Sequence, residues 1–481
     1  MRRLFSGGIV VVWLVLVGML VAEQNAPLDE HQRLAPMAGE GGARDEWFGV
    51  YREERKVGWV HRTLSRRPEG WIVRDDSELH LAMLGTAQRL RTSLIAETGE
   101  TFGLRRFRFG LVSPAATFRA EGEVVGNRLR VRHGSGSASN LLELDLSGAI
   151  QLPSTQRNAR ALWEAEPGDK FRTPVFSPLT MQYEDILVEV GERATMDGPD
   201  GEVEALELLE RHQGLEARAW IARDGSTLAE HGGLGFRLVR ESADTAPRGL
   251  DAFAPMDLAS ESRIPFEGGL TAPRASRFLR LRVDGAAAGR IPQDPPRQTV
   301  RGGVLEVRLE DVTAPGEVSS PGPTEEDRLP SLFIESDDPE IAARARSIVE
   351  AEESSDRRAR LLVDWVHENL EQTPSVTLPS ARAVLASGRG DCNEHAVLLA
   401  ALARAIGIPA RVVTGVVYAD GGFYYHAWNE LWLERWMSAD AIFGQMPADA
   451  THVKFLEGGP ERHLELAEIV GRIRFSPVEE P

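Results

Sequence analysis

The chain has 481 residues, and its content of 42% apolar and 27% charged residues is that of a globular protein with two or three domains. A formal net charge of −18 disfavours nucleic acid as a partner, since the sequence has no basic stripe with interleaved aromatic residues. Cys392 is the only cysteine, which excludes an intramolecular disulfide and a thiolate metal cluster.

Residues 1–22 are typical of an export signal. Arg2 and Arg3 precede an apolar run over residues 9–22, which is short for a membrane-spanning helix of about 20 residues and suits a signal-peptide core. Leu20 makes a poor cleavage site, so an uncleaved anchor is an alternative, and a twin-arginine signal is a third. Each interpretation predicts an exported protein, periplasmic or extracellular, that meets a membrane only through this segment.

The next residues are predicted to form a polar linker, 23–45, and then a β-rich domain, 46–245. In this domain apolar and polar residues alternate in short runs, and a charged turn at 53–56 separates two of them as in a hairpin. One apolar and one polar face predict an antiparallel sheet with a solvated side. Residues 246–330 are rich in proline and glycine around two alternating runs, so we expect a linker with a small β segment.

A C-terminal domain of helices and strands is predicted over residues 331–475. Asp338 before Pro339, Ser355 and Ser380 indicate three helix starts, and the lone cysteine opens a fourth helix. Strands are then expected at 411–418, 423–433 and 436–440. The predicted fold class is therefore α+β, with antiparallel β-rich structure first and the helix-containing domain second.

The cysteine stands in the segment GDCNEHA, residues 390–396, between a glycine-bearing loop and an apolar helical run. It is therefore predicted to lie at the first turn of a buried helix, where unpaired N–H groups and the helix dipole favour the thiolate. The competing interpretation is a small buried hydrophobe, and position alone does not separate the two. The lack of disulfides in an exported chain fits a cysteine kept for its chemistry or tolerated in a core.

His426 is the candidate base and Asp440 the candidate orienting acid. The strand predicted here carries His426 and Trp428 on one face, because side chains alternate. A two-residue turn would put Asp440 on the opposite face, whereas a three-residue turn over 433–435 puts it opposite Trp428 and diagonal to His426. We therefore predict a three-residue turn or a bulge.

In combination, these residues resemble the transglutaminase-like superfamily. The resemblance is carried by GDCNEHA, by AIGIPARVVTG at 405–415, by HAWNE at 426–430 and by WMSAD at 436–440, in the family's order. It covers roughly residues 338–456, and the two residues after Asp440 differ from the family's Asp-Pro-Thr segment. The resemblance implies a papain-like core with a catalytic triad of Cys392, His426 and Asp440, with no cofactor and no metal.

The chemistry implied by this resemblance is acyl transfer. Cys392 attacks a carboxamide carbonyl, His426 transfers protons and Asp440 holds the imidazole. The Cys392 N–H is a natural oxyanion donor, and a second donor is not identified. Water as acceptor gives a protease, amidase or deamidase, which we expect with a protein or peptide substrate, and an amine gives a crosslinking transglutaminase. The other alternative is a non-catalytic binding or scaffold protein of the cell envelope, and the oligomeric state stays open.

Four further polar residues have structural interpretations that we prefer. His395 could be a second base or part of a metal pair with the cysteine, but a packing role is favoured. Asp391 is predicted to cap the helix, where it would oppose thiolate formation if it pointed at the sulfur. Glu430 is predicted to be a structural partner on its hairpin, and Asp449 a spare acid in a loop.

Overall fold

The computed structural model describes residues 32–33 and 42–478, with internal gaps. These gaps are residues 84–85, 115–116, 136–139, 156, 158–159, 199–200, 213–214, 233–234, 251–254, 258–262, 286–287, 312–320, 375–379 and 459–471. The predicted export signal and most of the predicted linker 23–45 lie outside the described residues. No helix in the part of the chain that is described is both long and apolar enough to cross a membrane.

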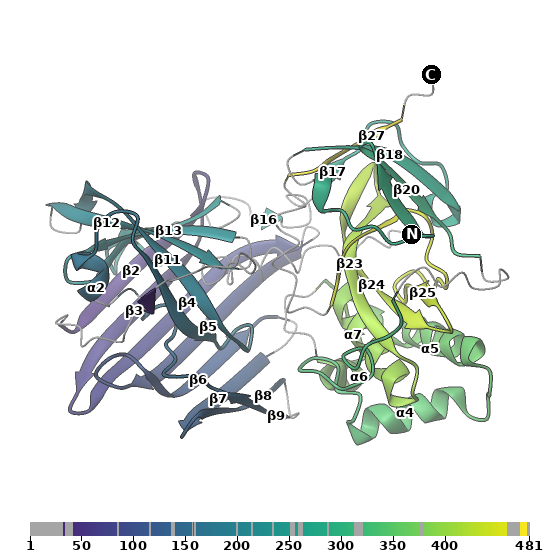
Figure 1. Cartoon of the computed structure of the whole chain (residues 1–481), viewed down its shortest axis with the longest axis horizontal. Coiled ribbons are helices and arrows are strands. Elements are labelled where there is room, and N and C mark those ends of the chain that lie inside the picture. The colour runs from purple at the N-terminus through teal and green to yellow at the C-terminus, as the bar shows by residue number, and fades with distance from the viewer. Residues whose placement is uncertain are drawn as a thin grey trace. The chain divides into compact units, whose positions relative to one another are not determined.

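The chain forms two compact units, which consist mainly of the residues up to Met256 and of those from Asp257 onward. The first unit is built on one large sheet of antiparallel hairpins (Figure 1). Its two hairpin series, β2–β9 and β10–β15, are joined because β15 returns to pair with β2. β9 and β10 lie toward opposite ends of the strand order in this sheet. Gln151, which follows β9 in the chain, forms a β-bridge with Val175 of β10.

The elements of the first unit, in chain order, are β1 Gln32–Arg33, β2 Arg44–Arg52, β3 Arg55–Arg67, β4 Gly70–Met83, β5 Thr86–Thr98, β6 Leu104–Val112, β7 Thr117–Val125, β8 Arg128–Ser135, β9 Asn140–Asp145, α2 Arg160–Glu164, β10 Lys170–Ser177, β11 Gln182–Gly198, β12 Gly201–His212, β13 Leu215–Ala222, β14 Thr227–His231, β15 Phe236–Glu241 and β16 Met256–Asp257. Their side chains follow the predicted alternation. In β7, for example, Phe118 and Ala120 are buried whereas Arg119 and Glu121 are exposed. The prediction of an antiparallel β-rich domain with a solvated face is confirmed.

The second unit has a five-stranded sheet at its centre. β23 Ala410–Ala419 and β24 Gly422–Trp432 form its middle hairpin, and β26 His452–Glu457 pairs with the other edge of β23. Two short strands, β17 Ile264–Pro265 and β25 Trp436–Ala439, pair with separate parts of the remaining edge of β24. Among the described residues, no strand pairs with this edge of β24 between Phe423 and Asn429.

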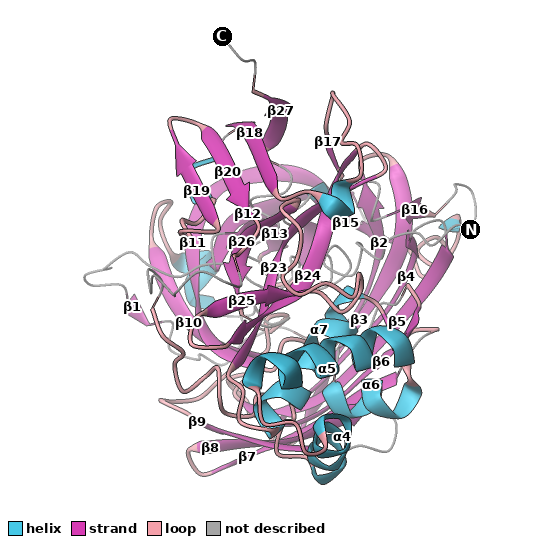
Figure 2. Ribbon diagram, turned by 90° about the vertical axis from the view of Figure 1, so that its right-hand side faces the viewer, coloured by secondary structure: helices cyan, strands magenta, loops and turns pink. Residues whose placement is uncertain are grey.

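Four described helices accompany this sheet, and they lie together at one end of β23 and β24 (Figures 1 and 2). They are α4 Pro339–Val349, α5 Ser355–Asn369, α6 Ala381–Ser387 and α7 Cys392–Ala405. Each begins after a side chain that accepts from its free N–H groups, namely Asp338, Ser354, Ser380 and Asp391. These starts agree with the predicted ones to within one residue. Every side chain of α7 from Cys392 to Ala403 is buried, so this helix forms the core of the unit.

The region predicted as a linker with a small β segment, 246–330, contains three strands of a small sheet. β18 Phe278–Asp284, β19 Gln298–Arg301 and β20 Val304–Arg308 form this sheet, and β27 Arg474–Pro477 completes it. Arg297 donates to the backbone carbonyls of Ala448 and Asp449, at 3.1 and 3.0 Å, and so joins this sheet to the segment before β26. The local proline and glycine content does not reveal the pairing of β18 with the distant β27.

Candidate active site

Cys392 is the first residue of α7, and 1% of its surface is exposed. A capping box fixes this helix start: Asp391 Oδ1 accepts from the Asn393 N–H at 2.8 Å, and Glu394 Oε2 accepts from the Asp391 N–H at 2.9 Å. Gly390 allows Glu394 to fold back, because a Cβ at 390 would lie 2.3 Å from the Glu394 Cβ. The residues around the cysteine therefore cooperate to hold the thiol at the helix start.

The thiol lies against the edge of β24. The Ala427 N–H donates a hydrogen bond to the Cys392 sulfur. Among the described residues, β17 pairs with this edge only at Gly422 and Phe423, and β25 pairs with it only from Asn429 onward. The middle of the edge is thus open to the start of α7. Because His426 directly precedes Ala427, this hydrogen bond places the cysteine beside the candidate base.

Two buried side-chain hydrogen bonds fix α7 along β24. Tyr425 Oη donates to Asn393 Oδ1 at 2.8 Å, and Asn429 Nδ2 donates to the Ala396 carbonyl at 2.9 Å. They flank the contact between the cysteine and the strand. Neither Tyr425 nor Asn429 was expected at the site, although both stand at alternate positions from Ala427, which is the signal that could have identified them.

His426 and Asp440 are in direct contact. His426 Nε2 lies 2.7 Å from Asp440 Oδ2, and each residue is 1% exposed. The connection before Asp440 is the predicted three-residue turn: Trp432 pairs with Trp436, the Leu433 N–H donates to the Arg435 carbonyl, and Glu434 adopts a φ of 62°. The turn prediction is therefore confirmed, and the register it imposes brings the acid to the face of the histidine.

The second carboxylate oxygen of Asp440 is held by the chain that follows it. Asp440 Oδ1 accepts from the Ile442 N–H at 2.7 Å and from the Phe443 N–H at 3.3 Å. Ala441 and Ile442 replace the family's Pro-Thr, yet the loop still closes back on the acid. The carboxylate is thus fixed on both of its oxygens.

His452, in β26, is a member of this cluster that the sequence did not reveal. Its Nε2 lies 2.9 Å from Asp440 Oδ2, and its Nδ1 lies 3.1 Å from the Asp449 carbonyl oxygen. The ring is fully buried. A histidine three residues after Asp449 was the available signal. Asp449, predicted as a spare loop acid, contacts His452 and not His426.

Comparison with known proteins agrees with this geometry. Residues 342–441 match the profile of the Transglutaminase-like superfamily, and this range contains the cysteine, His426 and Asp440. This part of the chain belongs to the transglutaminase-like superfamily. The resemblance expected from the motifs is confirmed, as is the order of a β-rich N-terminal region and a transglutaminase-like C-terminal domain. No curated protein matches the chain.

Three solved structures are similar at low identity. A β-barrel-like protein of a domain of unknown function from Brucella abortus is 13% identical over 44% of this chain and 97% of that chain, with a TM-score of 0.34. A candidate cysteine protease from Cytophaga hutchinsonii is 14% identical over 60% and 73%, with a TM-score of 0.25. A candidate protease from Parabacteroides distasonis is 11% identical over 78% and 70%, with a TM-score of 0.21.

The electrostatics of the transglutaminase-like cysteine differ from the expectation of a stabilised thiolate. Burial raises the pKa of Cys392 well above its ordinary value, and the Asp391 and Glu394 carboxyl groups raise it further. The Ala427 N–H lowers the pKa of Cys392 but does not outweigh them. The net shift in the pKa of Cys392 is therefore opposite to the one expected from the helix start alone, because burial and the Asp391 and Glu394 carboxyl groups oppose the helix dipole.

The pKa of His426 is lowered below its ordinary value. Burial is the largest cause, and the His452 and Arg274 charges act in the same direction, whereas Asp440 opposes them. The pKa of Asp440 is itself lowered, because its hydrogen bonds with the two histidines outweigh burial. At neutral pH the resting site therefore holds a thiol, a neutral His426 and an ionised Asp440.

His426, Asp440 and His452 could also be considered as metal ligands, since their candidate ligand atoms lie within 4.8 Å of one another. Two of the separations, 2.7 and 2.9 Å, are those of direct hydrogen bonds. Ligand atoms about 2.1 Å from a tetrahedral zinc ion would be about 3.4 Å apart. The cluster fits hydrogen bonding and does not fit a metal ion.

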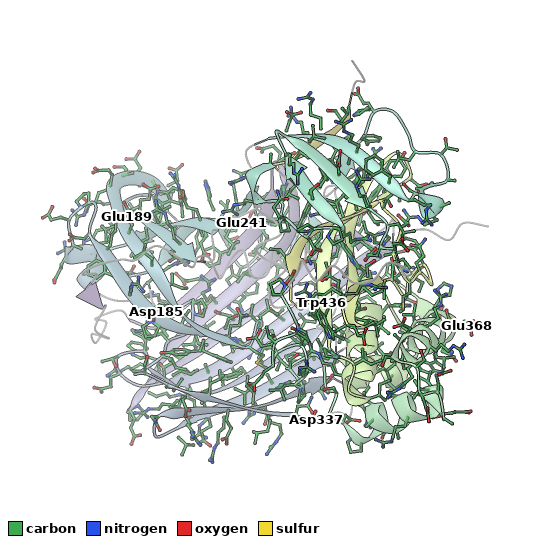
Figure 3. The ribbon with its side chains drawn as sticks, turned by 45° about the vertical axis from the view of Figure 1, so that its right-hand side comes forward. Asp185, Glu189, Glu241, Asp337, Glu368 and Trp436 are labelled. Atoms are coloured by element: carbon green, nitrogen blue, oxygen red, sulfur yellow. The ribbon has the colours of Figure 1, made fainter. Side chains whose placement is uncertain are left out.

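A groove of about 960 Å³ extends from the site. The residues that line it include Arg274, His367, Glu368, Gln372, His395 and Phe443. The centroid of the Phe443 ring lies 5.3 Å from that of the His426 ring, and His395 stands one turn along α7 from the cysteine, so two lining residues are neighbours of the site. Glu368, labelled in Figure 3, is exposed near the end of α5.

The remaining predicted residues have the structural contacts expected of them. Glu430 accepts hydrogen bonds from Arg411 and Lys454, so it is a partner within the sheet. The buried His395 donates its Nδ1–H to the Asp391 carbonyl oxygen at 2.6 Å. Asp391 is the helix cap.

Proposed function

We propose that this protein is a thiol-dependent acyl-transfer enzyme that hydrolyses carboxamide or peptide bonds. The observation that carries the proposal is the direct contact of His426 with Asp440 at the point of β24 where the Ala427 N–H meets the cysteine sulfur. The Nε2 bond to Asp440 leaves His426 Nδ1 as the atom that can take the thiol proton. Membership of residues 342–441 in the superfamily supports the same assignment.

In the proposed reaction, the Cys392 sulfur attacks the substrate carbonyl carbon while its proton passes to His426 Nδ1. The oxygen gains a negative charge, which the Cys392 N–H at the helix start can stabilise. The C–N bond then breaks, and the amine leaves with the proton from His426. Water adds to the thioester and loses a proton to His426. The C–S bond then breaks, the carboxylic acid leaves, and His426 returns the proton to the sulfur, which restores the thiol.

Asp440 contributes by fixing the imidazole rather than by taking its proton. Both of its oxygens accept hydrogen bonds, and its pKa is lowered, so it remains ionised through the cycle. Because the resting thiol is neutral and buried, nucleophile activation requires proton transfer to His426 during attack. We propose a protein or peptide substrate because residues 342–441 match the transglutaminase-like superfamily and a groove of about 960 Å³ lies beside the site.

The first test is release of ammonia or amine from a panel of peptides and proteins, with the Cys392→Ala variant as control. We expect release by the wild type alone, together with a covalent acyl adduct on the tryptic peptide that contains Cys392. Equal release by the alanine variant would contradict the proposal. Crosslinked products in place of free acid would show that an amine, and not water, accepts the acyl group.

We also propose that the protein is exported, because residues 9–22 form an apolar run after two arginines. Fractionation of expressing cells, with the mass of the mature N-terminus, tests this. Recovery of the full chain in the cytoplasmic fraction would contradict it.

A further inference from the structure

The fully buried His452 ring has acceptors at both of its nitrogens. Nε2 points to the Asp440 carboxylate at 2.9 Å, and Nδ1 points to the Asp449 carbonyl at 3.1 Å and its carboxylate at 3.4 Å. A neutral imidazole has only one N–H and would place a lone pair against one of these oxygens. The arrangement is satisfied only when both nitrogens carry a proton.

The surrounding charges favour this doubly protonated form. Burial lowers the pKa of His452, but the Asp449 and Asp440 carboxylates outweigh it and raise the pKa above its ordinary value. Asp449 is held ionised in turn: Arg274 Nη1 lies 3.0 Å from its Oδ2, and Thr451 donates to its Oδ1. Burial alone would raise the pKa of Asp449, but His452 and, to a smaller extent, Arg274 and Thr451 outweigh it and lower the pKa.

The charged and titratable groups facing His452 come from several elements. His426 of β24 lies 5.5 Å away between ring centroids, and Asp440 and Asp449 belong to the loops around β25 and β26. Arg274, in the 3-10 turn Pro273–Ala275, reaches Asp449 and the Phe443 ring. One cationic imidazole and one arginine thus balance two carboxylates, and His426 is the neutral member.

We propose that His452 is a positioning residue that stays protonated, holds the same Asp440 oxygen that His426 contacts, and keeps His426 in the neutral form that a general base requires. This inference rests on the proposed function, because it assigns His426 as the base. It adds a fourth residue to the Cys392, His426 and Asp440 set. In an isolated His–Asp pair the acid raises the pKa of the histidine. Here the positive charge of His452 offsets part of the effect of Asp440 on the pKa of His426.

The inference predicts a specific pH behaviour. Removing the His452 charge while keeping a hydrogen-bond donor should raise the pKa of His426, because Asp440 then acts on His426 alone. His452→Gln is the suitable change. The acid limb of kcat/KM should move to higher pH with it, whereas loss of packing alone would lower activity without moving the limb.

The test is titration of the histidine rings by 15N NMR in the full-length protein, which needs no substrate. We expect a doubly protonated His452 at pH 7 in the wild type, and an upward shift of the His426 titration by at least about half a pH unit in His452→Gln. His133→Gln, which removes a buried histidine of the first unit, is the matched control and should leave His426 unchanged.

Asp449→Asn provides a second variant that leaves the ring in place. Without the Asp449 carboxylate, His452 should lose its second proton at lower pH, and the His426 titration should again shift upward. A neutral His452 in the wild type, or an unshifted His426 in the folded variants, would overturn the inference. Because this readout does not involve acylation, its failure is distinct from failure to acylate Cys392, which would instead refute the proposed function.

Discussion

The two units bury charged groups in different ways. In the first unit Arg157 donates to both oxygens of Glu210, at 2.6 and 2.7 Å, and also pairs with Glu230 at 2.7 Å, which Arg62 contacts as well. The second unit also buries the pair of Glu430 with Lys454, but the cluster at its site consists of Asp440 and two histidines. Arginine keeps its charge at all accessible pH values, whereas histidine changes charge near neutrality. The first arrangement can hold a fold, and only the second can move a proton.

The largest expected effect tests the second arrangement. His426→Ala should reduce kcat/KM by about 10²- to 10⁴-fold, because the thiol proton then has no acceptor. The measurement is steady-state turnover of a substrate found in the peptide panel. Hydrogen exchange of the α7 amides serves as control for folding. A kcat/KM within about threefold of the wild-type value would show that His426 is not the general base.

The corresponding change in the first unit should affect stability and leave the chemistry intact. Arg157→Met leaves Glu210 and Glu230 buried without their main partner, which should cost about 3–5 kcal/mol. Hydrogen exchange of the β12 and β14 amides measures this loss. Arg218→Met, at an arginine that is 52% exposed and pairs at the surface, should cost at most about 1 kcal/mol. An equal loss of unfolding free energy in the two variants would contradict the structural role assigned to the buried Arg157 cluster.

Acid should weaken the first unit through the same pairs. Burial alone would raise the pKa of Glu230, but the Arg157 and Arg62 charges outweigh it and lower the pKa from 4.5 to about 2. A carboxylate with a lowered pKa stabilises the fold above pH 4.5, and this stability is lost as the pH falls toward 2. We expect a loss of about 3 kcal/mol in that window. In the Glu230→Gln variant the free energy of unfolding should depend less on pH across this window than in the wild type. Parallel curves of unfolding free energy against pH for the two proteins would argue against the assignment.

The smallest effect concerns the thiol. Asp391→Asn keeps a capping side chain but removes a carboxylate that raises the pKa of Cys392. Alkylation by iodoacetamide at pH 7 should therefore become about three- to tenfold faster. Since the protein has one cysteine, the intact mass reports the rate directly. A rate equal to that of the wild type would show that burial alone controls the thiol.

Features set by local sequence were predictable. Helix caps such as Asp338 and Ser380 and the 433–435 turn depend on neighbours within a few residues, and the turn fixed the face of Asp440. His452 was missed because it meets Asp440 only after β26 pairs with β23. The pairing of β18 with β27 was not predicted for the same reason, since β27 lies far along the chain.

The thiol shows the limit of a single local rule. The helix dipole correctly suggests lower pKa values at a helix start. At Cys392 it competes with complete burial and with Asp391 and Glu394 in the same turn, and these raise the pKa. Their combined effect depends on the packing of α7 against β24, which the motif does not encode.

The most direct test of the account is acylation of Cys392 by a small activated ester, followed by intact-mass measurement against time. We expect one acyl group to appear on the wild-type protein and then to be removed by hydrolysis. Acylation of the His426→Ala variant should be at least about 100-fold slower. Acylation of both proteins at the same rate, or an adduct that persists in Cys392→Ala, would contradict it.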